Sequence, residues 1–220
     1  GNYALFAGGT TGSTDSTVDA YNSSLTRSTP QALSTARSHL AGASVGNYAL
    51  FAGGYNSGAK SEVDAYNSSL ARITPMTLST ARSYLAGASV GNYALFAGGE
   101  KSSYKSTVNA YDSSLARSTP TALSTARSHL AGASVGDYAL FAGGTLFAGG
   151  AKTEVDAYDS SLARSTAPAL STARSHLAGA SVGNYALFAG GITITNGSIE
   201  STVNAYERPH ISIPAQKIYL

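Results

Sequence analysis

One nine-residue stretch, Gly-Asn-Tyr-Ala-Leu-Phe-Ala-Gly-Gly, returns five times along this 220-residue chain with almost no change. Its leading glycines are 45, 45, 45 and 47 residues apart, at Gly1, Gly46, Gly91, Gly136 and Gly183. A fixed period of this size is typical of repeat architectures, in which each unit buries its apolar surface against its neighbours. We therefore expect one domain over 1–220, made of the units 1–45, 46–90, 91–135, 136–182 and 183–220.

Three segments of each unit predict strands, and the second unit serves as the example. Residues 47–52 form a nearly all-apolar run stopped by two glycines, which indicates a buried strand. Residues 62–66 alternate polar and apolar side chains, which predicts a strand with its polar side chains outward. A weaker outer strand over 70–74 is limited by Pro75.

The segment before each apolar run is ambiguous, because its Ala and Leu content also suits a helix and a helical repeat such as HEAT. An interior glycine costs a helix about 1 kcal/mol relative to Ala, and the unit has no segment for a second helix. We therefore predict an inner strand, with glycine where neighbouring backbones crowd together. These strands are expected at 38–45, 83–90, 128–135 and 175–182. Four antiparallel strands per unit predict an all-β fold, a five-bladed β-propeller.

Three features of each unit together resemble the kelch repeat, a β-propeller family: the paired glycines after an apolar strand, the following Val-Asp-Ala-Tyr, and an Ala-Arg-Ser that opens the next inner strand. The resemblance covers every complete unit and implies a fold that serves mostly in binding and less often as an enzyme. The chain has no Trp, so the outer kelch tryptophan is absent. We expect its packing role to fall to Leu25, Leu70, Leu115 and Leu162.

Closure of the propeller needs a strand that the repeats do not supply. The sequence contains five copies of the second and third strands but only four of the inner strand. We predict that 210–213 is the outer strand of the last blade and that 216–220 pairs with 3–7, so that the two termini close the ring. In the alternative, 210–220 is one outer strand, and the first blade stays three-stranded or is completed by another molecule.

The opening on glycine in mid-repeat predicts a processed product or a fragment.

The repeats differ mainly between their second and third strands, at 10–17, 55–62, 100–107, 145–154 and 192–202. In a four-stranded meander these loops leave the propeller on the same face as the connections between blades. Loops that do not pack against the core can change their sequence freely, which explains the variation without a function. The other interpretation is a binding face diversified on a fixed scaffold. Its expected anchors are Tyr55, Tyr104, Phe147 and Ile192.

A second candidate site lies at the start of the inner strands. One repeat position carries an arginine in four units: Arg37, Arg82, Arg127 and Arg174. Two residues further on, the same units carry His39, Tyr84, His129 and His176. Residues two apart on an inner strand are expected to point toward the mouth of the central channel, where such a ring could hold a carboxylate, a sulfate or a sugar acid. The kelch resemblance also implies a ligand at these positions. Alternatively, each Arg binds backbone carbonyls between blades and each His packs.

Composition and spacing exclude several function classes. Charged residues make up 12% of the chain, the net charge is +2, and the basic residues are not clustered, so we expect no nucleic-acid partner. No apolar run approaches a membrane span, so we expect no membrane partner. Zero cysteines exclude thiolate chemistry, and histidines on separate blades are expected to lie too far apart for one metal ion. We expect no cofactor.

The repeated acidic position is expected to be structural, since Asp19, Asp64 and Asp156 share their slot with Asn109 and Asn204. The sequence therefore predicts a non-enzymatic, monomeric binding module for a glycan or a protein. A structural scaffold and a sugar-acid-processing enzyme are the alternatives. Repeats so close to identity would fit an extracellular, cell-surface or phage-particle protein.

Overall fold

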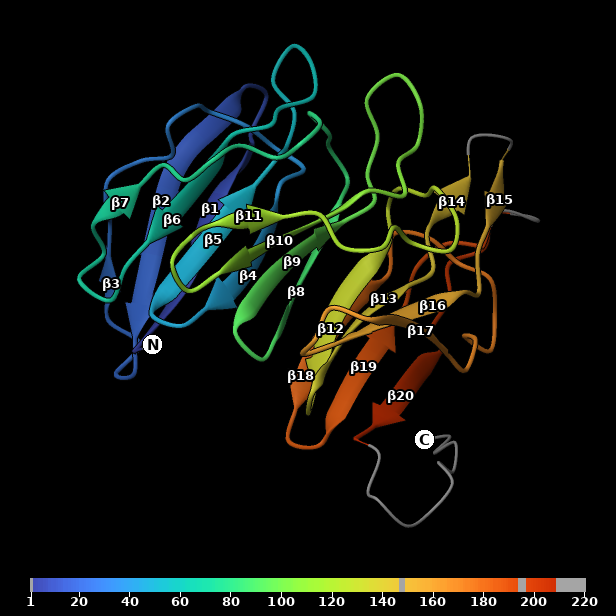
Figure 1. Cartoon of the computed structure of the whole chain (residues 1–220). Coiled ribbons are helices and arrows are strands. Elements are labelled where there is room, and N and C mark those ends of the chain that lie inside the picture. The colour runs from blue at the N-terminus through green and yellow to red at the C-terminus, as the bar shows by residue number, and fades with distance from the viewer. Residues whose placement is uncertain (1, 147–148, 194–196, 209–220) are drawn as a thin grey trace.

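In a computed structural model, the structure describes residues 2–146, 149–193 and 197–208, and every regular element within them is a β-strand (Figure 1). The first sheet contains β1 (Tyr3–Thr10), β2 (Thr14–Asn22) and β3 (Arg27–Ser28). The second contains β4 (Ala41–Val45), β5 (Tyr48–Ala52), β6 (Val63–Tyr66) and β7 (Arg72–Ile73). The third contains β8 (Ala86–Val90), β9 (Tyr93–Ala97), β10 (Val108–Asp112) and β11 (Arg117–Ser118).

The remaining strands complete the array. The fourth sheet contains β12 (Ala131–Val135), β13 (Tyr138–Ala142), β16 (Val155–Asp159) and β17 (Arg164–Ala167). The fifth contains β18 (Ala178–Val182), β19 (Tyr185–Ala189) and β20 (Val203–Glu207). A small hairpin of β14 (Thr145–Leu146) and β15 (Gly150–Ala151) belongs to the longer loop of the fourth blade. The predicted all-β, five-bladed β-propeller is confirmed, and helical repeats are excluded for the described residues. No helix among them could span a membrane.

Each sheet is an antiparallel meander. In the second blade, for example, the register runs from Ala41 opposite Ala52 to Val45 opposite Tyr48. The second, third and fourth blades have the predicted four strands, whereas the first and fifth sheets have three strands each within the described residues. The two predicted C-terminal strands, at 210–213 and 216–220, lie outside the described residues, so closure by the two termini stays a prediction.

The inner strands β4, β8, β12 and β18 lie next to one another around the axis. A side chain on Gly87 would collide with the carbonyl of Gly42, and one on Gly132 with that of Gly87, which confirms the predicted crowding at the repeated glycine. Hydroxyl groups join these strands further along. The backbone N–H of Ser44 donates to Ser89 Oγ at 3.0 Å, and the same contact recurs in the next two blades.

Neighbouring blades meet through one interface that is repeated along the chain. Each sheet has an aromatic face, which carries the Phe of its second strand and the Tyr of its third strand, and an aliphatic face on the opposite side. Between the second and third sheets, Phe96 and Tyr111 are buried in one cluster with Leu50, Val63 and Ala65. The Tyr111 hydroxyl also donates to the Met76 carbonyl at 2.9 Å. The core is therefore a series of layers between blades.

The leucines expected to replace the kelch tryptophan behave differently along the chain. Leu115 packs against the cluster between the second and third sheets, and Leu162 packs against the next cluster. Leu25 is exposed, since its blade is the first of the array. The packing prediction is thus confirmed for Leu115 and Leu162, whereas Leu70 is half-buried and is not part of the cluster between the first and second sheets.

Candidate functional site

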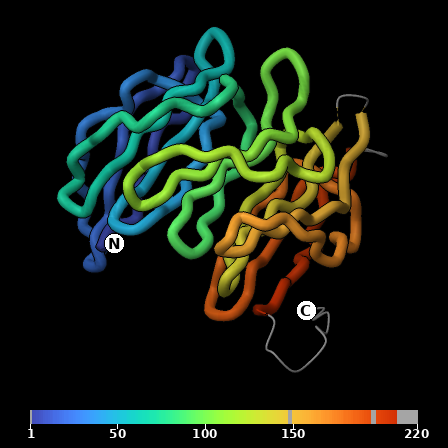
Figure 2. The backbone as a smooth tube through the Cα atoms, viewed as in Figure 1, coloured from blue at the N-terminus to red at the C-terminus, as the bar shows by residue number. Residues whose placement is uncertain are grey.

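The variable loops and the connections between blades share one face of the propeller. Ser38, just before the inner strand, and Tyr55, the first residue of a variable loop, exchange two backbone hydrogen bonds of 3.0 and 2.7 Å. Equivalent bridges join Ser83 to Glu100, Ser128 to Thr145, and Ser175 to Ile192. Figure 2 shows the loops after β5 and β9 projecting on the same side, opposite the turns that join β8 to β9 and β18 to β19. The predicted common face is confirmed.

The four arginines do not line the channel mouth as expected, because all four side chains are completely buried. Nη2 of Arg37 donates to the Phe51 carbonyl at 3.1 Å, and the equivalent bonds in the other blades measure 3.0 Å. The inner strand begins at Ala41 instead of residue 38, so the strand alternation used for the prediction does not apply to Arg37. The arginines bind carbonyls, as the alternative foresaw, but within their own blade.

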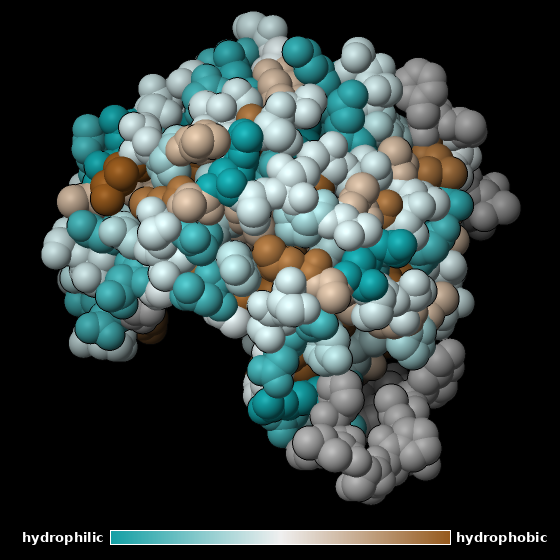
Figure 3. Space-filling view, viewed as in Figure 1, coloured by the Kyte–Doolittle hydropathy of each residue, from teal (hydrophilic) through white to brown (hydrophobic). Residues whose placement is uncertain are grey.

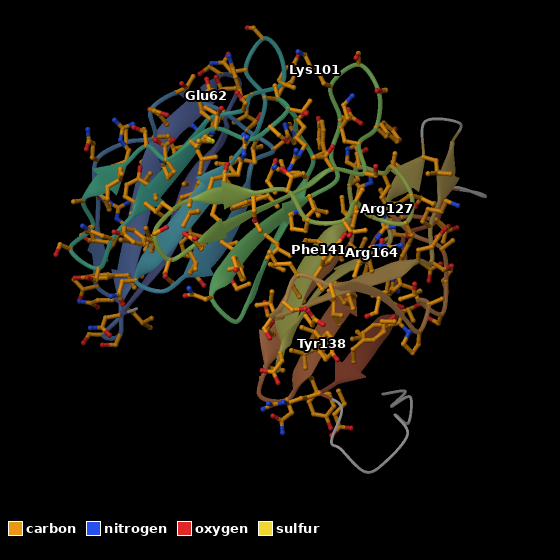
Figure 4. The ribbon with its side chains drawn as sticks, in the orientation of Figure 1. Glu62, Lys101, Arg127, Tyr138, Phe141 and Arg164 are labelled. Carbon is orange, nitrogen blue, oxygen red and sulfur yellow. The ribbon has the colours of Figure 1, made fainter. Side chains whose placement is uncertain are left out.

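Two of these arginines form buried ion pairs with the repeated acidic position. Arg37 lies 2.9 Å from Asp64, and Arg127 lies 2.8 Å from Asp156. Each carboxylate also meets an arginine of the outer strand, such as Arg164 at 2.8 Å from Asp156. Figure 4 shows Arg127 and Arg164 close together in the fourth blade. Buried charges are tolerated only when paired in this way.

This pairing corrects the expectation that the polar side chains of the third strand point outward. Asp64 is fully buried in β6, and its oxygens also accept hydrogen bonds from the backbone and hydroxyl of Ser34. In the fifth blade, Arg174 donates to Asn204 Oδ1 at 2.8 Å instead. Burial lowers the pKa of Arg82 to about 10, so this guanidinium stays charged at neutral pH. The acidic slot therefore joins the strands of its own blade to the connection that precedes them.

The residues two positions after each buried arginine form a stacked ladder of aromatic rings around the channel mouth. The ring centroids of His39 and Tyr84 are 4.2 Å apart, and those of Tyr84 and His129, and of His129 and His176, are 4.1 Å apart. Backbone bonds run along the same ladder, since Tyr84, His129 and His176 each donate their N–H to the carbonyl of the preceding ladder residue at 3.0–3.1 Å. The ladder joins four blades through equivalent residues.

Each ladder residue is held in an unusual backbone conformation. His39, Tyr84, His129 and His176 all have positive φ values, between 53° and 57°. The neighbouring serine hydroxyl contacts Nδ1 of His39 and His129 at 2.9 Å, and of His176 at 3.1 Å. Non-glycine residues in this region are uncommon and persist where the surroundings hold them. The serine contact leaves Nε2 as the second polar atom of each imidazole.

The environment keeps one imidazole neutral. Burial, together with smaller contributions from the neighbouring His176 and His39, lowers the pKa of His129 to about 4. His129 is therefore uncharged at neutral pH, with one ring nitrogen protonated. Such a ring can both donate and accept hydrogen bonds without carrying charge.

Two cavities adjoin this ladder. One of about 290 Å³ is lined by the four rings and by Leu40, Leu85, Leu130 and Leu177. A second of about 500 Å³ is lined by Tyr84 together with loop residues that include Tyr55, Glu100 and Lys101. Because Tyr84 borders both cavities, the ladder and the loop residues form one continuous candidate site.

The predicted loop anchors are placed unequally. Tyr55 is exposed and lines the larger cavity, and Tyr104 is half-buried opposite Glu100 in the next loop. Ile192 is exposed beside Ser175. Phe147 lies outside the described residues. Sequence reasoning missed Glu100 and Lys101, although a charged pair opening one loop in place of uncharged residues was a usable signal.

The histidines are closer together than the sequence argument against a metal assumed. Neighbouring rings stack at about 4 Å, so separation between blades is not the obstacle. Stacking places the ring planes alongside one another, and the serine contacts occupy their Nδ1 atoms. Within the part of the chain that the structure describes, no group of three or more His, Cys, Asp or Glu side chains could hold a metal ion.

The fold and the site define the class of this chain as a five-bladed β-propeller with an aromatic ladder on its loop face. Among solved structures, the structure of YjhT has the same fold, with a TM-score of 0.76 over 93% of this chain and 78% of that chain. The two share 14% sequence identity, so the similarity shows the fold alone. No family model matches the chain, and no curated protein matches it in sequence. The kelch resemblance stays a prediction.

Proposed function

We propose that this chain is a non-enzymatic binding module that holds a glycan at its loop face, on the aromatic ladder and Tyr55. The observation that carries the proposal is the stack of His39, Tyr84, His129 and His176 along a cavity of about 290 Å³. Binding sites combine apolar and aromatic walls with a few placed polar atoms, and this cavity has both.

The chemistry of the ladder favours an uncharged, hydroxyl-rich ligand. Neutral His129 can exchange hydrogen bonds with sugar hydroxyls through Nε2, because Nδ1 already contacts Ser128. The rings of Tyr84 and Tyr55 offer apolar surface with a polar tip at the two cavities. The buried arginines are not available to an anion, so the sugar acid considered from the sequence loses its main support.

The acidic residues support binding over catalysis. A hydrolase or epimerase needs a carboxylate free to accept and donate protons. Asp64 and Asp156 are each held between two arginines, and both repeat the same structural role. The kelch resemblance, in which propellers serve mostly in binding, supports the same proposal.

A glycan array followed by calorimetry on the full chain tests this function. We expect a preference for a set of glycans, with Tyr84→Ala and Tyr55→Ala each weakening binding by about 1–3 kcal/mol. Tyr138→Ala is the matched control, since Tyr138 lies at the opposite end of the blades from Lys101 (Figure 4). An array without any preference, or binding that only Tyr138→Ala weakens, would contradict the proposal.

A further inference from the structure

The two end sheets expose side chains that are buried in every other blade. Phe6 on the aromatic face of the first sheet is 63% exposed, whereas its equivalent Phe51 is 8% exposed. On the aliphatic face of the fifth sheet, Val203 is 40% exposed, whereas its equivalent Val63 is 2% exposed. All five residues of β18 are exposed as well. The uncovered surface is thus one face at each end of the array.

The exposed aromatic face is already assembled in the geometry of the internal interfaces. Phe6 and Tyr21 meet edge to face with their centroids 5.9 Å apart and their planes at 84°. The buried pair Phe51 and Tyr66 has values of 6.0 Å and 73°. Leu25 is exposed beside these strands, at the position where Leu115 packs against a preceding blade. This end therefore presents the aromatic half of a blade interface.

The other end presents the aliphatic half. Between the second and third sheets this half consists of Leu50, Val63 and Ala65 with their neighbours, all buried against Phe96 and Tyr111. The fifth sheet carries the same residue types at Leu187, Val203 and Ala205, none of which is buried. The chain builds this contact in each of its four internal clusters.

Within the part of the chain that the structure describes, the two free faces do not cover each other, as the exposure of Phe6 and Val203 shows. In Figure 1, β1–β3 and β18–β20 lie on opposite sides of the array. The outline of the molecule is indented between these two sides in Figure 3. Exposed apolar sheet faces of this kind mark interaction sites.

We propose that a second copy of this chain docks head to tail, with the aliphatic face of the fifth sheet of one copy on the aromatic face of the first sheet of the next. The contact reproduces the interface that already joins the blades inside each copy. Because the two faces differ, the contact is heterologous and can extend or close into a ring of copies. This assembly departs from the monomer expected from the sequence and does not depend on the proposed ligand.

Sedimentation of the full chain between about 1 and 200 μM tests this assembly, a range that covers micromolar contacts. The wild type is expected to gain mass in whole-chain steps as concentration rises. Phe6→Asp and Val203→Asp each remove one face at a position that is already exposed, so both variants keep the fold and stay monomeric. Each should weaken association about 30-fold or more. Met76→Asp, at an exposed site between the second and third sheets, is the control and should assemble as the wild type does.

Mixing the two variants gives the sharpest result. Phe6→Asp keeps its aliphatic end and Val203→Asp keeps its aromatic end, so an equal mixture should form dimers and nothing larger. A wild type that stays monomeric throughout, or a mixture that does, would overturn the proposal. Protection of Phe6 from solvent in such a monomer would assign the face to residues 209–220 or to the chain's own fifth sheet. Self-association that neither variant reduces would also overturn it.

Discussion

Arg37 and Asp64 form an ion pair at 2.9 Å in which neither side chain is exposed to solvent. The pair ties the segment before the inner strand to the third strand of the same blade. Arg72 approaches the same carboxylate at 3.3 Å from the outer strand. One acidic residue thus connects the inside of the blade to its outside, and Asp156 does so in the fourth blade.

Replacing Asp64 by Ala should destabilise the protein by about 3–5 kcal/mol, because it leaves buried guanidinium charge uncompensated. Asp19 is the matched control. Its side chain is partly exposed, and among the described residues its ion pair is with Arg27 alone, at 3.5 Å. Asp19→Ala should cost about 1 kcal/mol or less. Urea denaturation of the two variants gives the comparison, and equal losses would refute the role given to the buried pair.

Acid should weaken the fold through His129. Its pKa is about 4 in the folded chain, below the ordinary value of 6.5, so the unfolded chain binds the proton more readily. Stability is then complete above about pH 6.5 and falls as the pH drops toward 4, by up to about 3 kcal/mol. Tyr84 fills the equivalent place in the ladder, so His129→Tyr should keep the stack and flatten this dependence. An unchanged pH profile in that variant would show that another group titrates.

Two glycines at the same repeat position should respond differently to a methyl group. Gly87→Ala forces a Cβ against the Gly42 carbonyl and should cost roughly 1–3 kcal/mol or more. In Gly42→Ala the nearest atoms to the Cβ belong to the Phe51 ring and the Leu50 carbonyl, at 3.4–3.9 Å, so its cost should be small. Thermal unfolding of both variants decides the matter. Equal melting temperatures would mean that the inner strands are less crowded than the structure indicates.

A further prediction concerns the two tyrosines of the loop face. Changing Tyr55 and Tyr104 together to Ala should weaken binding of the glycan found on the array by about 1–3 kcal/mol, if either tyrosine is an anchor. Only Tyr55 lines the cavity next to Tyr84, so most of the loss should come from Tyr55→Ala alone. Calorimetry on the single and double variants measures how the loss of binding free energy divides between the two tyrosines. Full affinity in the double variant would remove the loops from the site.

The period of the repeat predicts the architecture well, because near-identical units can only stack in one repeated way. The strand order, the crowding at Gly87 and the common loop face all follow from the sequence. The arginines were misplaced because strand alternation was extended back to residue 38, whereas His39 has a φ of 53° that breaks it. A positive φ on a residue other than glycine leaves no mark in the sequence.

The burial of Asp64 was missed for a related reason. Alternation along the third strand predicts an outward carboxylate, and only the tertiary position of Arg37 makes its burial tolerable. The aromatic ladder, in contrast, was within reach of the sequence. Residues at one repeat position become neighbours when blades pack side by side, so His39, Tyr84, His129 and His176 were bound to meet.

The imidazole nitrogen signals of the full chain, followed by NMR during titration with the glycan found on the array, test the central claim most directly. His39, His129 and His176 line the cavity, and Nδ1 of each imidazole contacts a serine hydroxyl, which leaves Nε2 for the ligand. We predict that the imidazole signals shift in proportion to the glycan bound, while backbone signals of the turns at 46–47 and 91–92 stay fixed. Shifts confined to those turns, with unchanged imidazole signals, would contradict the account.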